Sequence, residues 1–414
     1  MKKRFTVIVL VLSIMILASA SAFCLSNQEW VEDLEYLQTK LAKVHKNVYF
    51  NLSKKEYNAY FEEFIADSEQ LNQKEKVLRL AELFAKIGDS HTTFAFRKYF
   101  DTFYPIYFKK FGNDYFVIAA TEEYQDLMGA KLVSINGNNI ESIREKLARI
   151  IVAENQAGID SQTQYFLNAP ALLKYCGVID ENNTYAFKTK SGEEIRSFSR
   201  ISANEFNKNI KLVQYEKSVV QQHARQLFWY DYMSEDKLLY FQYNSCWSRE
   251  LEKKHRGNDN PKLPYFNKTT DEIVKILKNK DVDKFVIDVR FNGGGSSAQG
   301  TRFAKRLSKM DLDCEVYTII GNSTFSSAII NAIDFQKRLD ATLVGQPTRG
   351  KPNHYGEVKS FPLPNSKIRV SYSTKYFKLI KDDMDSLQPD IILHRDYDDF
   401  LKGIDTILKR IKEM

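Results

Sequence analysis

Apolar residues follow a helical repeat in the region after residue 25. Those between residues 30 and 44 recur every three to four positions, which predicts a first amphipathic helix. The capping box Ser-Lys-Lys-Glu that begins at Ser53 predicts the start of a second helix. A third helix is predicted over about 73–87, where Gly88 follows as a C-terminal cap. We therefore expect an N-terminal helical domain over residues 23–98.

From residue 99 onwards the pattern changes to short runs in which apolar and polar residues alternate, as in half-buried strands. Residues 129–147 combine a strand, an Asn-Gly turn, a second strand and a helix. This order resembles the later half of a PDZ domain, so we expect a small PDZ-like β-rich insert over residues 99–152. Residues 153–226 mix helical and hairpin patterns and are expected to connect this insert to the rest of the chain.

Beyond Leu227 strands and helices alternate regularly, which predicts an α/β core over residues 227–414. In "VIDVRFNGGGSS" a buried strand ends near Asp288, and three glycines then allow backbone N–H groups to point at an anion or an oxyanion. In "GNSTFSSA" the next strand ends at the start of a serine-rich helix. Both turns are expected at the carboxyl ends of their strands, where doubly wound sheets place their sites.

The hydroxyl residues of the second turn leave two interpretations open. Such side chains at a helix start can simply cap the free N–H groups. Alternatively, one of them is a nucleophile, because the positive end of the helix dipole favours a negatively charged oxygen. The N–H group of the following residue can then join a glycine N–H group in an oxyanion hole.

The first residues predict a signal peptide rather than a membrane span. Lys2, Lys3 and Arg4 precede an apolar run of thirteen residues, and small residues then lead up to Ala22. This run is too short to span a bilayer comfortably. We therefore expect a signal peptide over residues 1–22, cleavage after Ala22 and export to the extracellular space, the periplasm or the cell envelope. Lipidation of Cys24 is left open.

Charge and cysteine content exclude several classes of function. The formal net charge of the chain is +7, and loss of three cationic residues with the signal peptide leaves +4, too weak an excess to indicate nucleic-acid binding. The four cysteines are scattered and lack the spacing of a metal site. We therefore predict no metal, no cofactor and no nucleic-acid partner, and we expect buried or free thiols with one disulfide left open.

Four motifs occur together in a characteristic order. They are "VIDVRFNGGG", "TFSSA", "LVGQPTRGK" and "LQPDI", and "GDSHT" precedes them in the N-terminal part. In this order and spacing the chain resembles the C-terminal processing (tail-specific) serine peptidases, a group that includes the tricorn protease core and the interphotoreceptor retinoid-binding repeats. The resemblance implies a crotonase-like α/β core, a serine nucleophile and a polypeptide substrate. It assigns the nucleophile to Ser326 and the oxyanion hole to the N–H groups of Gly294 and Ser327.

Two residues are candidates for the base that takes the serine proton. In the processing peptidases a lysine has this role, and Lys351 lies at the matching position, 25 residues after the serine. In tricorn-like members a Ser-His pair and a late acid act instead, which match Ser90, His91 and Asp383, an aspartate where the tricorn pattern has glutamate. We favour His91, because a lysine pKa of about 10.4 would have to fall by about 3, whereas histidine needs no large change. His354 is a further candidate base.

Three functions follow as hypotheses. The first is an exported serine endopeptidase that cleaves extended or C-terminal polypeptide segments. The second is a non-catalytic ligand carrier of the retinoid-binding type, and the retained serine, base and glycine-rich turn argue against it. The third is a crotonase-type acyl-CoA enzyme, which the signal peptide argues against because acyl-CoA substrates are cytosolic. The sequence leaves the oligomeric state and the substrate open.

Overall fold

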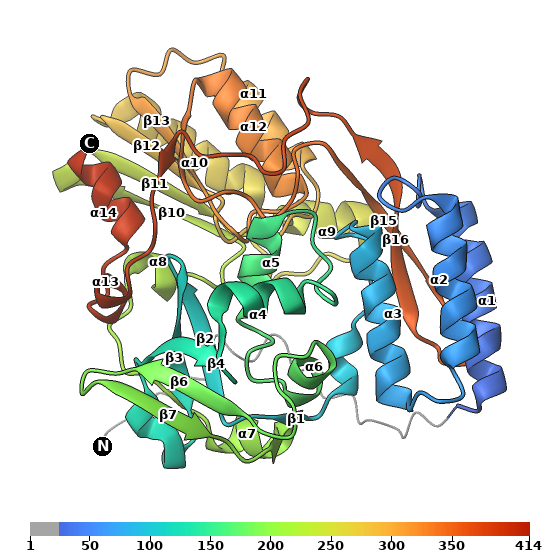
Figure 1. Cartoon of the computed structure of the whole chain (residues 1–414). Helices are drawn as coiled ribbons and strands as arrows, with labels where there is room; N and C mark the ends of the chain where they lie inside the picture. The colour runs from blue at the N-terminus through green and yellow to red at the C-terminus, as the bar shows by residue number, and fades with distance from the viewer. Residues whose placement is uncertain (1–24) are drawn as a thin grey trace.

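The computed structural model describes residues 25–414, and Figure 1 shows N-terminal helices, a β-rich middle part and a larger α/β part. The predicted signal peptide, its cleavage after Ala22 and the question of lipidation at Cys24 lie outside the described residues. Within residues 25–414, no helix is both long enough and apolar enough to cross a bilayer.

Three helices open the described chain: α1 (Asn27–Val44), α2 (Lys54–Asp67) and α3 (Gln73–Ile87). Each begins with a capping box, in which the side chain before the helix and a glutamate in the first turn accept each other's backbone N–H groups. Gly88 ends α3 in the left-handed conformation, with φ 74°. The three predicted helices are therefore confirmed.

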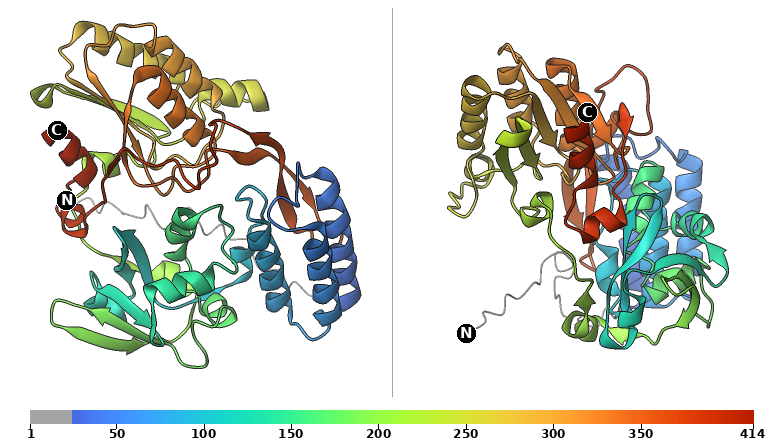
Figure 2. Two further views of the ribbon diagram at one scale, coloured as in Figure 1. Left: turned by 45° about the horizontal axis from the view of Figure 1, so that its top comes forward. Right: turned by 90° about the vertical axis from the view of Figure 1, so that its left-hand side faces the viewer.

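A long hairpin from the last third of the chain, β15 (His354–Pro362) and β16 (Arg369–Phe377), lies against these helices (Figures 1 and 2). Apolar side chains of the hairpin belong to the same buried cluster as those of the helices. At the hairpin turn, the buried carboxylate of Asp33 accepts the backbone N–H groups of Asn365 at 2.7 Å and Ser366 at 2.8 Å. The N-terminal helices and the hairpin therefore share one core.

The middle part is built on a seven-stranded sheet with the order β2-β3-β4-β6-β7, to which β5 and β9 are added at the side. Asn136 and Gly137, both with positive φ, form the predicted turn between β4 and β5, and α4 (Ile140–Leu147) follows. The predicted order of strand, turn, strand and helix is therefore confirmed. The strands are β2 (Ile106–Phe111), β3 (Asp114–Ala120), β4 (Lys131–Ile135), β5 (Asn138–Asn139), β6 (Thr184–Lys188), β7 (Glu193–Ser197) and β9 (Lys211–Leu212).

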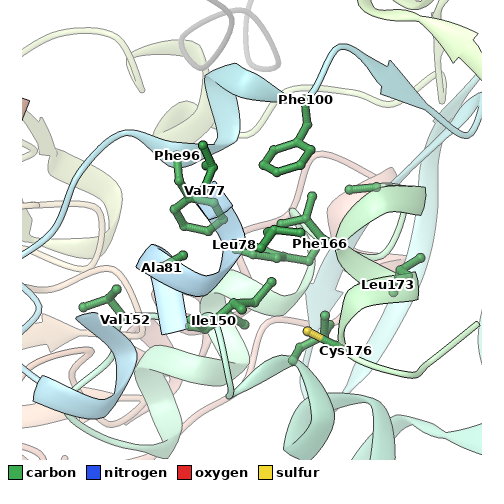
Figure 3. Packing of buried hydrophobic residues seen from close by; sticks show 14 of the residues in the cluster. Val77, Leu78, Ala81, Phe96, Phe100, Ile150, Val152, Phe166, Leu173 and Cys176 are labelled. Atoms are coloured by element: carbon green, nitrogen blue, oxygen red, sulfur yellow. The ribbon is translucent and has the colours of Figure 1, made fainter. Parts of the chain in front are cut away.

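Shorter elements flank this sheet and connect it to the other parts of the chain. They are η1 (Phe96–Tyr99), β1 (Thr102–Phe103), η2 (Glu122–Leu127), α5 (Gln156–Thr163), α6 (Pro170–Tyr175), β8 (Ile201–Ser202), α7 (Ala203–Asn209) and α8 (Val219–Gln222). Figure 3 shows side chains from α3 packed against residues of these connections, among them Val77, Leu78, Phe166 and Leu173. The helices and the middle part are therefore joined by a continuous hydrophobic core.

The α/β part contains a six-stranded sheet with the order β10-β11-β12-β13-β14-β17. Only the edge strand β10 is antiparallel to its neighbour, and the other pairs are parallel. The strands are β10 (Phe228–Met233), β11 (Leu238–Tyr243), β12 (Lys284–Asp288), β13 (Glu315–Ile320), β14 (Thr342–Gly345) and β17 (Ile391–Ile392). A 3-10 turn, η3 (Ser234–Asp236), joins the first two.

Helices cover both faces of this sheet. One buried cluster joins the sheet to α10 (Phe266–Asn279), α11 (Ala298–Leu307) and α12 (Ser327–Leu339). A second cluster joins its other face to α14 (Thr406–Glu413). The remaining helices of this part are α9 (Arg249–Arg256) and α13 (Tyr397–Leu401). The α/β alternation predicted beyond Leu227 is therefore confirmed, and the protein is a mixed α/β protein with several sheets.

The cysteines of the described chain do not pair. Cys176 and Cys246 are buried free thiols, and Cys314 is a half-buried free thiol. Burial raises the pKa of both the Cys176 and the Cys246 thiol to about 12, which makes them poor nucleophiles. The disulfide left open by the sequence is therefore absent among these three residues.

Candidate active site

The two turns predicted to carry chemistry are in direct contact. The Gly293–Gly295 turn follows β12, and Ser326 precedes α12. Gly294 has φ 105° and lies so close to the serine that a methyl group on its Cα would be 2.9 Å from Ser326 Cβ and 3.3 Å from Ser326 Oγ. The hydroxyl of Ser327 donates to the carbonyl of Gly295 at 2.8 Å. The parallel strands therefore bring both turns to the same edge of the sheet, as expected.

Ser326 has an unusual backbone conformation, with φ 55° and ψ −125°. For a residue with a side chain, a sparsely populated conformation of this kind costs about 1–3 kcal/mol and is found mainly at functional sites. The Ser326 side chain makes no capping hydrogen bond to α12. Thr324 instead has a structural task, because its hydroxyl donates to the Val289 carbonyl at 2.9 Å. The capping interpretation that the sequence left open therefore does not apply to Ser326.

Some backbone N–H groups around Ser326 already donate a hydrogen bond within the protein, and others do not. The N–H of Gly294, a predicted oxyanion donor, donates to the side-chain oxygen of Asn292 at 2.9 Å. The N–H of Ser327, the other predicted donor, has no hydrogen-bond acceptor within the described chain, and the same holds for Gly295. The N–H groups of Ser327 and Gly295 are therefore available to a ligand oxygen, whereas that of Gly294 is occupied.

His91 comes from the N-terminal part but lies beside the nucleophile turn. It follows α3 by four residues, and only 9% of its surface is exposed. Its ring stacks on the ring of Phe325, with 4.4 Å between the ring centroids and 25° between the planes. Because Phe325 immediately precedes Ser326, the structure brings the predicted histidine and the predicted serine to one place.

Two buried carboxylates face the Nδ1 atom of His91. Asp89 Oδ1 lies 3.7 Å away and Glu154 Oε1 lies 3.9 Å away, and neither distance is a hydrogen bond. Glu154 accepts the backbone N–H groups of Lys351 at 2.8 Å and Ser90 at 3.3 Å. Burial raises the pKa of Glu154 to about 7, although the neighbouring His91 and these N–H groups act in the opposite direction.

Asp89 is held differently from Glu154. Its Oδ2 atom lies 3.0 Å from His45 Nε2 and accepts the Thr92 hydroxyl at 2.5 Å. Its Oδ1 atom accepts the backbone N–H of His91 at 2.9 Å. Burial alone would raise the pKa of Asp89, but the hydrogen bond from His45, the nearby ring of His91 and neighbouring hydroxyls hold it well below its usual value. Asp89 therefore remains ionised and fixed.

Lys351, the alternative base, is engaged elsewhere. Its Nζ atom forms an ion pair with Asp385 Oδ1 at 2.8 Å. Partial burial alone would lower the pKa of Lys351, but the hydrogen bond and the charge of Asp385 outweigh it, so the pKa is raised above the usual lysine value. A general base near neutral pH needs the opposite change. The ammonium of Lys351 is therefore paired and protonated.

Asp383, the predicted late acid, is exposed and makes no ion pair with His91 in the described chain. It lines a cavity of about 330 Å³ that also reaches Asp89, Glu154 and Lys351. The carboxylates that face His91 are therefore Asp89, which lies in the "GDSHT" motif but was given no role, and Glu154, which lies in none of the motifs.

The two remaining candidates lie next to His91. The hydroxyl of Ser90 is buried and has no hydrogen-bond partner among the described residues. The ring of His354 stacks on that of His91 with 5.8 Å between centroids, and its Nδ1 lies 3.0 Å from the carbonyls of Lys351 and Pro352. Since carbonyls only accept, this nitrogen carries a proton. Burial lowers the pKa of His354, so it is a neutral neighbour of His91.

Comparison with known proteins supports the fold. No family model and no curated protein sequence matches the chain. The structure of mature CPAF in complex with lactacystin matches with a TM-score of 0.60 and 11% identity, over 94% of this chain and 98% of that chain. A CPAF mutant matches with a TM-score of 0.61 and 11% identity, over 94% and 97%. The photosystem II C-terminal processing protease matches more weakly, with a TM-score of 0.41 and 12% identity, over 89% and 94%.

Identities of this size concern the fold and not the chemistry, and the CPAF matches extend over nearly the whole of both chains. The family resemblance that the four sequence motifs indicated is therefore confirmed for the fold. The chain has the mixed α/β fold that is seen in the CPAF structures.

Proposed function

We propose that this protein is an exported serine peptidase, which hydrolyses peptide bonds in extended or C-terminal polypeptide segments through an acyl-enzyme on Ser326. One observation carries the proposal: a strained serine that does not cap its helix is in contact with a glycine-rich turn. Nucleophile and oxyanion donors have to reach one reacting carbonyl, which requires such contact.

In this mechanism Ser326 Oγ attacks the carbonyl carbon of the peptide bond. His91 takes the hydroxyl proton and later gives it to the leaving amine. The negative charge that develops on the carbonyl oxygen is stabilised by the N–H groups of Ser327 and Gly295. Water then attacks the ester, with His91 again acting as base, and the acid product leaves.

In this proposal Glu154, and not Asp383 as the sequence motifs indicated, is the acid that assists His91. An acid that faces Nδ1 of the base selects the tautomer in which the other ring nitrogen carries the lone pair. It also stabilises the imidazolium that forms when the serine proton is taken. The 3.9 Å between Glu154 Oε1 and His91 Nδ1 shortens to a hydrogen bond with a small movement, as is common on substrate binding.

Finer features of the fold belong to the same proposal. The parallel order of β11, β12, β13 and β14 supports a crotonase-like core, and the β4–β5–α4 order supports a PDZ-like origin of the middle part. The polypeptide partner and the export by a signal peptide are retained. The predicted domain ranges are also retained, except that the β15–β16 hairpin packs with the N-terminal helices. The carrier and acyl-CoA hypotheses are not favoured by any contact at Ser326.

The test uses the mature protein with an unfolded, casein-like substrate and a fluorophosphonate label that reacts with activated serines. Wild type is expected to cleave the substrate and to carry the label on Ser326. Ser326→Ala is expected to lose both, while Ser323→Ala, a change of an exposed serine in the same turn, is expected to keep both. Unchanged cleavage by Ser326→Ala would refute the proposal.

A further inference from the structure

The side chains of Asp89, His91 and Glu154 converge on one small volume. One carboxylate oxygen from each acid and a ring nitrogen of the histidine all lie within 4.8 Å of one another. The histidine contributes a second, independent observation, because its Nδ1 atom is buried, has no hydrogen-bond partner among residues 25–414 and lies near both carboxylates. A buried polar atom of this kind normally has a partner.

We propose that this cluster is a binding site for one Zn²⁺ ion, and that the bound ion switches the peptidase off. The binding itself follows from the geometry alone. The inhibitory effect rests on the proposed function, because it requires His91 to be the base for Ser326.

The distances fit zinc after a small contraction. Zinc binds imidazole nitrogen at about 2.0–2.1 Å and carboxylate oxygen at about 2.0–2.2 Å in a tetrahedron, which places neighbouring ligand atoms roughly 3.4 Å apart. Nδ1 of His91 lies 3.7 Å from Asp89 Oδ1 and 3.9 Å from Glu154 Oε1. The two nitrogen–oxygen distances therefore need to shorten by about 0.3–0.5 Å, and the two carboxylate oxygens, which lie within 4.8 Å of each other, must also approach.

Both carboxylates are already oriented by groups behind them. His45 Nε2 and the Thr92 hydroxyl hold Asp89. Two backbone N–H groups hold Glu154. Metal ligands in proteins are typically fixed by such outer hydrogen bonds. The cavity of about 330 Å³ that reaches both acids gives the ion a route and leaves room for a water molecule as fourth ligand.

The ligand set favours zinc over the abundant hard cations. Calcium and magnesium are bound mainly by oxygen atoms, and calcium takes six to eight of them. One imidazole with two carboxylates suits zinc, and cobalt(II) is a spectroscopic substitute with similar ligand preferences. Of the cations near the cluster, Lys351 is paired with Asp385, whereas the buried guanidinium of Arg349 interacts with Glu154 and offsets part of its negative charge.

Binding at Nδ1 has a definite consequence for catalysis. A neutral imidazole that ligates a metal through Nδ1 carries its proton on Nε2. The ring then has no lone pair left to accept the proton of Ser326. Any proton that was on Nδ1 passes to solvent when the ion binds. Zinc and general-base catalysis therefore exclude each other at His91.

Binding is tested on the full mature chain carrying Ser326→Ala, so that the result does not depend on peptidase activity. Titration with Co²⁺ is expected to give one equivalent of a visible absorption spectrum, which Zn²⁺ displaces and Ca²⁺ does not. Adding His91→Ala is expected to weaken binding at least tenfold, and so is adding Glu154→Gln, whereas His255→Ala, a change of an exposed histidine, is expected to leave it unchanged. Thermal unfolding shows whether each variant is folded. If either His91→Ala or Glu154→Gln fails to fold, Co²⁺ binding by the remaining one tests the site.

Inhibition is tested separately on the wild-type chain. Zn²⁺ is expected to abolish cleavage of the unfolded substrate, and a chelator is expected to restore it. Absence of stoichiometric Co²⁺ binding, or binding that neither His91→Ala nor Glu154→Gln weakens, would overturn the site. If the ion binds at this site but zinc does not inhibit the peptidase, the proposed inhibition by zinc is refuted. A wild type without any peptidase activity that still binds Co²⁺ through His91 would refute the proposed function and leave the metal site standing.

Discussion

The contact between Gly294 and Ser326 predicts a large effect of a single methyl group. In Gly294→Ala the new Cβ would lie 2.9 Å from Ser326 Cβ, 3.2 Å from the Phe325 carbonyl oxygen and 3.3 Å from Ser326 Oγ. Carbon atoms that are not bonded prefer about 3.5–4.0 Å. The serine and the turn must therefore separate by about 0.6–1.1 Å.

The magnitude follows from this displacement. A misplacement of about 1 Å at a reacting group can cost about 10²-fold in rate. We therefore expect kcat of Gly294→Ala to fall by about two orders of magnitude. The φ of 105° at this position adds about 1–3 kcal/mol of backbone strain for alanine. This is less than the typical stability of about 5–15 kcal/mol, so the variant should remain folded.

Gly293→Ala is the matched control. An added Cβ there meets nothing within 4 Å, and its φ lies outside the left-handed region. It should keep its activity within about twofold, as expected for an exposed change worth less than about 0.5 kcal/mol. Both variants are assayed by cleavage of the unfolded substrate and by labelling of Ser326, with thermal unfolding as a check. Equal activities for Gly293→Ala and Gly294→Ala would refute the geometry on which the site is built.

Four further substitutions test the roles of site residues and the stability of the α/β part. Lys351→Ala should keep at least about a third of the activity, because the ammonium is paired with Asp385 and its pKa is raised; an inactive variant would restore the lysine as base. Glu154→Gln should lower kcat by about 10²- to 10⁴-fold, the usual contribution of general-base catalysis, whereas Asp383→Asn should lower it much less. If the cleavage assay shows the larger loss for Asp383→Asn, then Asp383 is the acid that assists His91. Arg290→Met should lower the free energy of unfolding by about 3–5 kcal/mol in a denaturant titration, because it leaves two buried carboxylates of the α/β part unpaired; a change below about 1 kcal/mol would contradict this.

Local features of the fold were predictable because they depend on neighbouring residues. The capping box at Ser53 satisfies N–H groups of the turn that follows it, and the Asn136–Gly137 turn depends on two residues that tolerate positive φ. The contact between the glycine turn and Ser326 was also predictable, since parallel strands bring their carboxyl ends to one edge.

The acid beside His91 could not be predicted in this way. Glu154 reaches the site through N–H groups of Ser90, 64 positions earlier, and Lys351, 197 positions later. No spacing rule connects such distant segments, and a single glutamate in a chain with 53 acidic residues gives no signal. Asp383 was chosen by its distance from a motif, yet it lies in an exposed loop where no packing holds it near the histidine.

The hairpin explains why His91 is in place without a separate closing movement of the N-terminal part. Thr93, two residues after the histidine, pairs with Ser371 of β16, through N–H to carbonyl bonds of 3.2 and 2.8 Å in the two directions. The same hairpin begins at His354, directly after the segment whose N–H group holds Glu154. Its far end is clamped to α1 by Asp33. Backbone hydrogen bonds and a shared core therefore tie the segment of the base to the part that carries the nucleophile. A base fixed in this way has its orientation set by folding, so the remaining adjustment on substrate binding is the small approach of Glu154 to Nδ1.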